Sequence, residues 1–275
     1  MRLIKSCNPE HNIRTSSTAK LQVGSYYFYK QHENLEIKDE GEATNKLYVD
    51  IRGPFSISAA NLNALTGGQF VSGTDQHSSA PRLPAFTRIK VQCLRVRRDG
   101  DPVIVDEARF EIERSLPNGF VFCMSLTDEN QTSPLFESYS DSWSLPFEKS
   151  GLFAWHLSRM MTTQLQPEWI EPKLQQDIES GKISLDQVTV EVHDRAILYT
   201  DRHITLTAGD EEKINGVFSI IRSLAFTKPP RYSRDREYRF LLNVIAEHAN
   251  GTKTIYAPAA ELVRLTPDIP WVDLD

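Results

Sequence analysis

The 275-residue chain contains little cysteine, and the way its cysteines are placed excludes two kinds of protein. The three cysteines, Cys7, Cys93 and Cys123, are far apart and odd in number, which is not the pattern of a disulfide-stabilised secreted domain. None of them belongs to a Cys-x-x-Cys pair, so the sequence does not predict a structural zinc site. We therefore expect a protein of a reducing compartment.

Long apolar runs and targeting segments are missing as well. No stretch reaches the roughly 20 apolar residues that a membrane-spanning helix requires. The first residues, MRLIKSCNPEH, lack the apolar core of a secretory signal. From these two absences we expect a soluble, cytoplasmic protein that has no membrane partner.

The sequence also lacks the motifs of several enzyme classes. No two histidines lie four residues apart on an expected helix, and there is no Gly-x-Ser-x-Gly sequence. The stretch GKIS at 181–184 lacks the glycines of a phosphate-binding loop and follows a helix rather than a strand. His193 and Asp194 are adjacent on an expected strand, where neighbouring side chains point to opposite faces, so they do not suit a metal site.

What is present is a strand-rich pattern with a few helices. Alternating or β-branched stretches predict strands over residues 1–7, 21–30, 46–58, 86–98, 103–112, 118–130, 183–200 and 237–244. Helical spacing predicts helices over residues 150–165, 171–182 and 209–227. Glycine, serine and proline crowd residues 61–85 and predict a long loop. Because strands and helices do not alternate regularly, we expect one α+β domain over residues 1–275, with a loop-rich insertion around 61–85.

The helix expected over residues 150–165 carries a stripe of large apolar side chains. They recur at helical spacing and comprise Leu152, Trp155, Leu157, Met160 and Met161. Such stripes usually face inward, so we expect core packing rather than a binding surface.

The most unusual stretch is FTKPPRYSRDREYRFLL, residues 226–242, where charged residues run directly into apolar ones. If residues 237–244 form a strand, Glu237 and Arg239 share one face with Leu241 and Asn243. The residues between them point to the opposite face and are the better candidates for the core. Glu237 is then either a catalytic carboxylate on a rigid element or one partner of an ion pair with Arg239 or Arg236 on an exposed strand.

This stretch resembles the closing motif of a bacterial domain family of unassigned function, Phe-x-Lys-x-x-x-(Trp/Tyr)-x-x-Glu-x-Glu-(Trp/Tyr)-Arg. The matching residues are Phe226, Lys228, Tyr232, Glu237, Tyr238 and Arg239. Asp235 stands in place of the first glutamate. The segments VFCMSLTDEN and YSDSW resemble a second motif of that family, with Cys123, Ser125 and Trp143 in place, and GSYYFYKQHENLEIKDEGE resembles its acidic N-terminal block.

The order of these segments is similar to that of ADP-ribosyltransferases, including DNA-modifying toxins of bacterial defence systems. The resemblance implies an ADP-ribosyltransferase-like fold, NAD as the substrate and Glu237 as the catalytic acid. It also implies NAD contacts from Lys5, Ser6, Tyr26, Tyr27, Ser125 and Arg239. The usual first-strand residue of the family is His or Arg, whereas here it is Lys5 or Arg2.

The chemistry that the resemblance implies makes physical sense. Loss of nicotinamide leaves a ribose with oxocarbenium character, which a neighbouring carboxylate stabilises. An aromatic ring orients the nicotinamide, and an arginine binds the pyrophosphate. Arg14, Arg231 and Arg239 are the candidates for that arginine, and the sequence does not choose among them.

Partners and acceptor follow from the same resemblance. It implies a toxin of a phage-defence or toxin–antitoxin system, with a nucleic-acid acceptor and an antitoxin or other regulatory protein as partner. The formal net charge of −6 offers no global reason to bind nucleic acid, but the stretch Arg88–Arg98 is rich in cations. These cations either contact a phosphate backbone or form an exposed sheet face.

Two other functions remain open at this point. The first is a non-catalytic sensor domain on the same scaffold, which binds a nucleotide or a partner; the substitution at Asp235 favours it. The second is a metal-dependent nuclease that uses Asp39, Glu40 and Glu42, although scattered acids of this kind more often lie in a solvated loop.

Overall fold

A computed structural model describes residues 1–31, 44–69, 81–84, 86–97, 101–115, 118–128, 134–248 and 250–274. These residues form a mixed α/β structure with more strand than helix, as the sequence predicts. The loop expected over residues 61–85 lies largely outside the described residues. Its first residues belong instead to helix α2 (Ala59–Leu65).

The described residues fall into two compact units, and the expectation of a single ADP-ribosyltransferase-like domain over residues 1–275 stays a prediction. Unit 1 contains the described residues of 1–43, 117–198 and 231–275, and unit 2 those of 44–116 and 199–230. Unit 2 is therefore made of two stretches that both interrupt unit 1. Each unit has its own hydrophobic core. The chain therefore passes four times between the two cores, at 43/44, 116/117, 198/199 and 230/231.

Unit 1 is built on one antiparallel sheet. Its strands are β1 (Arg2–Cys7), β2 (Leu21–Ser25), β6 (Phe120–Thr127), β7 (Asp141–Pro146), β8 (Val188–Ala196), β12 (Glu237–Glu247), β13 (Lys253–Tyr256) and β14 (Leu262–Leu265). The order is β13-β12-β6-β1-β7, with β8 paired to β12 and β2 paired to both β6 and β14. Strand β12 thus lies in the middle of the sheet, with β6 on one side and β8 on the other.

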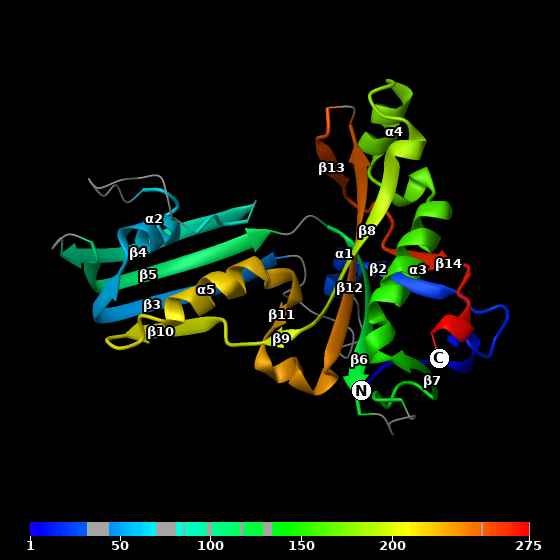
Figure 1. Ribbon diagram of the computed structural model, residues 1–275, viewed down its shortest axis with the longest axis horizontal. Helices are drawn as coiled ribbons and strands as arrows, with labels where there is room; N and C mark the ends of the chain where they lie inside the picture. The colour runs from blue at the N-terminus through cyan, green and yellow to red at the C-terminus, as the bar shows by residue number, and fades with distance from the viewer. Residues whose placement is uncertain are drawn as a thin grey trace. The chain divides into compact units, whose positions relative to one another are not determined.

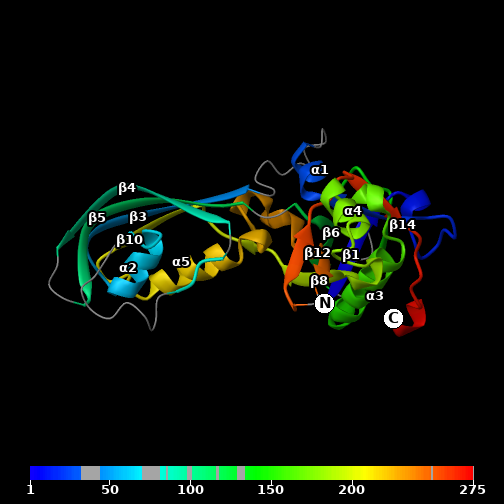
Figure 2. The same ribbon diagram turned by 90° about the horizontal axis from the view of Figure 1, so that it is seen from above.

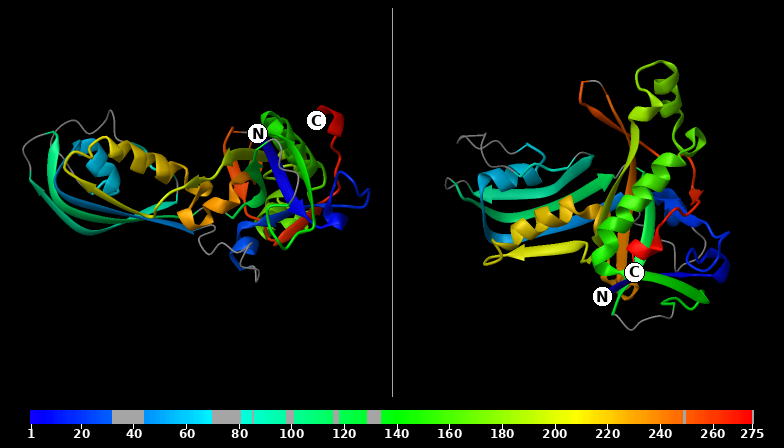
Figure 3. Two further views of the ribbon diagram at one scale, coloured as in Figure 1. Left: turned by 90° about the horizontal axis from the view of Figure 1, so that it is seen from below. Right: turned by 45° about the vertical axis from the view of Figure 1, so that its right-hand side comes forward.

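Helix α3 (Ser150–Thr163) covers the core face of this sheet and runs alongside β8 and β12 (Figure 1; Figure 3, right). Leu157, Met160 and Met161 are buried against the sheet, as predicted. Trp155, which we expected to be buried with them, is 55% exposed and lies against the guanidinium of Arg159. The correction follows from the helical geometry, because Trp155 lies off the narrow stripe that the sheet can cover.

Helix α4 (Pro172–Glu179) ends as the sequence predicts, since Gly181 adopts a positive φ of 71° that favours glycine. Helix α1 (Tyr26–Gln31) was instead expected to be the second half of a strand over residues 21–30. At Gly24 a Cβ atom would come within 2.9 Å of the Phe28 and Tyr29 rings, so only glycine lets the chain fold back there. The hydroxyl of Ser25 then accepts the N–H of Phe28 and starts the helix.

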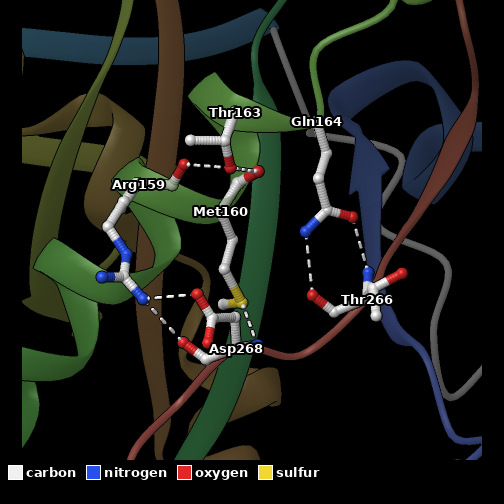
Figure 4. Close-up of polar contacts among 6 residues, drawn as sticks. All are labelled: Arg159, Met160, Thr163, Gln164, Thr266 and Asp268. Atoms are coloured by element: carbon white, nitrogen blue, oxygen red, sulfur yellow. Dashed lines mark hydrogen bonds and ion pairs between the residues drawn. The ribbon is translucent and has the colours of Figure 1, made fainter.

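The C-terminal segment of unit 1 is fastened to α3 by side chains (Figure 4). The amide of Gln164 pairs with the backbone of Thr266 in both directions, at 2.8 Å and 2.7 Å, much as a neighbouring strand would. Arg159 forms an ion pair of 2.6 Å with Asp268. These contacts hold the end of the chain over the core, where Trp271 meets Trp143 edge to face.

Unit 2 is a four-stranded curled sheet with two helices on one face, α2 and α5 (Lys213–Arg222) (Figure 2). Its strands, in spatial order, are β10 (His203–Thr207), β3 (Thr44–Ile57), β5 (Val103–Ser115) and β4 (Thr87–Arg97). The hairpin that the sequence predicts from residues 86–98 and 103–112 is the β4–β5 pair. The short strands β9 (Leu198–Tyr199) and β11 (Thr227–Lys228) pair separately.

Short 3₁₀ helices complete the described structure, at Pro9–His11, Phe147–Lys149, Pro167–Trp169, Leu185–Gln187, Leu224–Phe226, Pro230–Asp235 and Trp271–Asp273. No helix in the described part of the chain is both long and apolar enough to cross a lipid bilayer.

Candidate functional site

The two faces of β12 divide as the sequence predicts. Tyr238, Phe240, Leu242 and Val244 belong to the hydrophobic core of unit 1. Glu237 and Arg239 lie on the other face, together with the side chains directly opposite them on β6, which are Ser125 opposite Glu237 and Cys123 opposite Arg239. This opposite face is the candidate site.

Glu237 and Arg239 form a buried ion pair. The Nε and Nη2 atoms of Arg239 both lie 2.8 Å from Oε1 of Glu237. Glu237 is only 7% exposed and Arg239 4%. The ion pair that we considered from sequence is therefore present, but it is buried and not on an exposed strand. Arg236, the other candidate partner, forms a longer contact of 3.8 Å with Asp128.

The backbone on both sides of Glu237 is held firmly. The carbonyl of Arg236 accepts the N–H of Leu126 at 2.7 Å, and the carbonyl of Glu237 accepts the N–H of Ile197 at 2.9 Å. Arg236 itself has φ of 43°, which a residue other than glycine adopts only where its surroundings enforce it. Glu237 thus begins β12 in a fixed position, as a catalytic or binding carboxylate requires.

Cys123 is a third member of the site that the sequence analysis did not assign to it. Its thiol donates to Oε1 of Glu237 at 3.2 Å, so the same oxygen receives the thiol and the guanidinium. The family motif contains this cysteine, but nothing in the sequence places it beside the glutamate. Only the register of β6 against β12 brings the two together.

The sheet splits next to Cys123. On the edge of β6 away from β12, β1 pairs with residues 125–127 and β2 pairs with residues 120–121. Residues 122–124 lie between them and pair with neither strand. The ammonium of Lys5 reaches into this gap and donates to the carbonyl of Cys123 at 3.0 Å. Lys5 therefore satisfies a backbone group that no strand covers.

Lys5 sits in an environment that disfavours its charged form. Its ammonium lies 4.9 Å from the centre of the Phe122 ring, a core side chain whose face favours a cation, but burial has the larger effect. Removal from water lowers the pKa of Lys5 below its ordinary value, and the nearby Cys123, Cys7 and Glu237 oppose that shift. Lys5, which the sequence predicts to contact NAD, is thus turned toward the peptide of Cys123.

The two tyrosines predicted to meet nicotinamide have different surroundings. Tyr26 is 1% exposed, and the guanidinium of Arg239 lies 5.7 Å from the centre of its ring. Tyr27, the next residue, is 49% exposed. Tyr26 is the one that the structure brings to Arg239.

The other residues proposed from sequence are distributed unevenly. Ser125 is buried opposite Glu237, whereas the hydroxyl of Ser6 accepts the N–H of Leu135 at 2.9 Å. Arg14 donates to the carbonyl of Ser144 and lies over the Trp271 ring, and Arg231 lies over the ring of Tyr232. Arg2, the alternative on the first strand, donates to the Ser144 hydroxyl. Among the three pyrophosphate candidates, Arg239 is the one that the structure shows in contact with Glu237.

The cation-rich stretch of Arg88–Arg97 is strand β4 of unit 2, and acids lie directly across from it on β5. Arg95 contacts Glu107 at 3.7 Å, and Arg97 binds Asp106 at 2.7 Å. In the strand register, Arg88 lies opposite Glu113 and Lys90 opposite Glu111. The arrangement is that of an exposed sheet face with charges of both signs. Arg98 lies outside the described residues.

Three comparisons were made with known proteins. Neither the protein-family models, nor the curated proteins, nor the solved structures gave a match to this chain.

A metal centre finds no support among the residues that the structure describes, where no three potential ligands of the His, Cys, Asp or Glu type gather around one point. Asp39, Glu40 and Glu42, the acids considered for a nuclease, lie outside those residues. The candidate site consists of the Glu237 carboxylate, the Arg239 guanidinium, the Cys123 thiol and the Tyr26 ring. Lys5 lies next to it, where the sheet splits. Such a set can stabilise a developing positive charge and orient a flat ring.

Proposed function

We propose that this protein is an NAD-dependent ADP-ribosyltransferase with an ADP-ribosyltransferase-like fold in unit 1. It acts in the cytoplasm as a toxin of a phage-defence or toxin–antitoxin system, and it transfers ADP-ribose to nucleic acid. The observation that carries the proposal is that the carboxylate of Glu237 lies on a fixed strand end beside Arg239, whose guanidinium faces the ring of Tyr26. The resemblance of the closing motif supports the same residue.

The proposed reaction assigns one task to each group. The bond between ribose C1′ and nicotinamide breaks, and nicotinamide leaves as a neutral molecule with the electron pair. Glu237 stabilises the positive charge that develops on the ribose, while the ring of Tyr26 packs against the nicotinamide. A nucleophilic atom of the acceptor then bonds to C1′ and loses its proton to water. Arg239 holds the carboxylate in place.

The acceptor and the partner rest on the resemblance alone. The cations of β4 do not strengthen the case for a nucleic-acid acceptor, because Arg95 and Arg97 are engaged with Glu107 and Asp106. An antitoxin or other regulatory protein is the partner that this class of toxin requires. Mass spectrometry of nucleic acid and protein from cells that express the chain identifies the acceptor, by an added ADP-ribose.

The test of the catalytic residue needs a variant that keeps the fold. Glu237→Gln leaves Arg239 buried without a counter-charge, so loss of activity alone could reflect unfolding. The charge-swapped variant Glu237→Arg/Arg239→Glu keeps the pair but moves the carboxylate about 7 Å along the strand. We expect it to remain folded and to release no nicotinamide from NAD. The matched control is Glu247→Gln, at the exposed end of the same strand. Full activity of the swapped variant would exclude Glu237 as the catalytic acid.

A second candidate function is a non-catalytic nucleotide-binding or partner-binding domain on the same scaffold. The observation that favours it is the burial of the Glu237–Arg239 pair, since a nearly inaccessible ion pair also suits a purely structural role. Incubation with labelled NAD separates the two functions. Transfer of label or release of nicotinamide supports the enzyme, and binding without turnover supports the sensor.

A further inference from the structure

Three donors meet one oxygen atom of the candidate site. Oε1 of Glu237 receives Nε and Nη2 of Arg239 and the thiol of Cys123. The guanidinium and the thiol come from different strands, since Arg239 is on β12 and Cys123 lies directly opposite it on β6. The thiol thus ties the carboxylate to the neighbouring strand.

The thiol is itself fixed from the far side. The ammonium of Lys5 holds the carbonyl of Cys123 at 3.0 Å, at the point where β1 and β2 leave β6. A chain of contacts therefore runs from Lys5 on β1, through Cys123 on β6, to Glu237 on β12.

We infer that Cys123 is a positioning residue for Glu237, whose protonated thiol orients the carboxylate toward the substrate. The inference deepens the proposed function and rests on it. In this role the thiol touches neither NAD nor the acceptor. It restricts the rotation of the glutamate side chain, and so preserves the orientation that the reaction needs.

A thiol donor gives this arrangement a dependence on pH that a hydroxyl donor lacks. Charged groups from both neighbouring strands lie beside Cys123: Lys5 from β1, and Glu237 and Arg239 from β12. Once the thiol loses its proton, it can no longer donate to Oε1 and adds a negative charge beside the carboxylate. Activity should then fall on the alkaline side as the thiol ionises.

The first experiment compares Cys123→Ser with Cys123→Ala in nicotinamide release from NAD. Serine keeps a donor, so we expect the serine variant to retain most of the activity and to lose the alkaline decline. Alanine has no donor, so we expect kcat to fall about fivefold with little change in KM. A wild-type rate in Cys123→Ala, or the same alkaline decline in Cys123→Ser, would overturn the inference.

The second experiment tests the contact without any activity. The thiols are labelled with iodoacetamide and identified by mass spectrometry. In Glu237→Gln the carboxylate that disfavours the thiolate is gone, so we expect Cys123 to react at least about fivefold faster than in the wild type. Cys93 of unit 2 should be unaffected and serves as the control. An unchanged rate at Cys123 would show that the thiol does not meet the carboxylate.

The labelling also reveals unfolding and keeps the two hypotheses apart. Cys7 is buried, so its labelling marks an unfolded unit 1. If Glu237→Gln unfolds, Glu237→Asp replaces it, because it keeps the charge but draws the carboxylate back by one methylene group. If the wild type releases no nicotinamide, the proposed function fails. Faster labelling of Cys123 in Glu237→Gln would then still establish its contact with Glu237. The absence of turnover would exclude a role of that contact in catalysis.

Discussion

Ion pairs occur on a sheet face in both units, but their surroundings differ. On β12 of unit 1, the side chains of Arg239 and Glu237 are 5% and 8% exposed and lie 2.8 Å apart. On the outer face of unit 2, the side chains of Lys46 and Glu111 are also 2.8 Å apart, but they are 45% and 18% exposed. The contact distance is the same, but water reaches the second pair far more than the first.

That difference decides what each pair does. A buried pair has lost its hydration, so removing one partner leaves an uncompensated charge in a medium that cannot solvate it. An exposed pair exchanges its partner for water and salt at little cost. The ion pairs on β3, β4 and β5 therefore belong to a solvated surface. The pair on β12 must instead be retained for a structural or functional reason.

The largest effect is expected from breaking the buried pair on one side. Arg239→Met leaves the carboxylate of Glu237 without its counter-charge, and we expect unit 1 to lose about 3–5 kcal/mol of unfolding free energy. Urea denaturation followed by tryptophan fluorescence measures it. The signal reports unit 1 alone, because all four tryptophans, Trp143, Trp155, Trp169 and Trp271, lie in that unit.

The charge-swapped variant Glu237→Arg/Arg239→Glu is the control for this prediction. Since it keeps both charges buried together, it should lose far less stability than Arg239→Met. Equal losses in the two variants would mean that local packing, and not the unpaired charge, dominates.

An intermediate effect is expected at Asp177, whose carboxylate has one buried and one exposed partner. It accepts the hydroxyl of Tyr256, which is buried, at 3.0 Å and pairs with the exposed Lys182 at 2.9 Å. Tyr256→Phe leaves a carboxylate oxygen without its buried donor, so we expect a loss of roughly 1–3 kcal/mol by the same fluorescence measurement. Lys182→Met should lose clearly less. The reverse order would contradict the role assigned to burial.

A smaller, pH-dependent effect is expected at the start of α5 in unit 2. Asp210 accepts the N–H and hydroxyl of Thr207 and pairs with Lys213, and these contacts lower the pKa of its carboxyl to about 2. A pKa lowered in the folded state stabilises at pH values above the unfolded value of about 3.9, and the stabilisation disappears as the pH falls toward about 2. Wild type should therefore exceed Asp210→Asn in stability at neutral pH, and the two should converge in acid.

Hydrogen exchange at the backbone amides of β5 measures this difference in stability. Tryptophan fluorescence cannot be used here, because unit 2 contains no tryptophan. A difference between wild type and Asp210→Asn that stays constant from neutral pH down to about pH 2 would contradict the proposed contacts.

The smallest effect is expected on the outer face of unit 2. Lys46→Met removes the partner of Glu111, but both groups are in contact with water. We expect a change close to the error of the hydrogen-exchange measurement at low salt, and none at about 0.5 M salt. A loss comparable to that of Arg239→Met would show that exposure does not separate the two pairs.

Much of the fold could be predicted because it is written in local periodicity. The alternation of β12, the helical stripe of Leu157, Met160 and Met161, and the β4–β5 hairpin all follow from the spacing of apolar residues. The prediction of a strand over residues 21–30 was wrong for its second half. Gly24 and Ser25 turn the chain into α1, and the aromatic residues that suggest a strand pack equally well on a helix.

By itself, the sequence determined that Glu237 and Arg239 share a face of a strand, because side chains alternate with a period of two. Only the tertiary structure decided that this face is buried, that Tyr26 rather than Tyr27 lies beside it, and that Cys123 donates to the carboxylate. It also decided that the chain forms two units. The physical reason is that burial and register depend on strands more than one hundred residues apart, whose pairing no local pattern specifies.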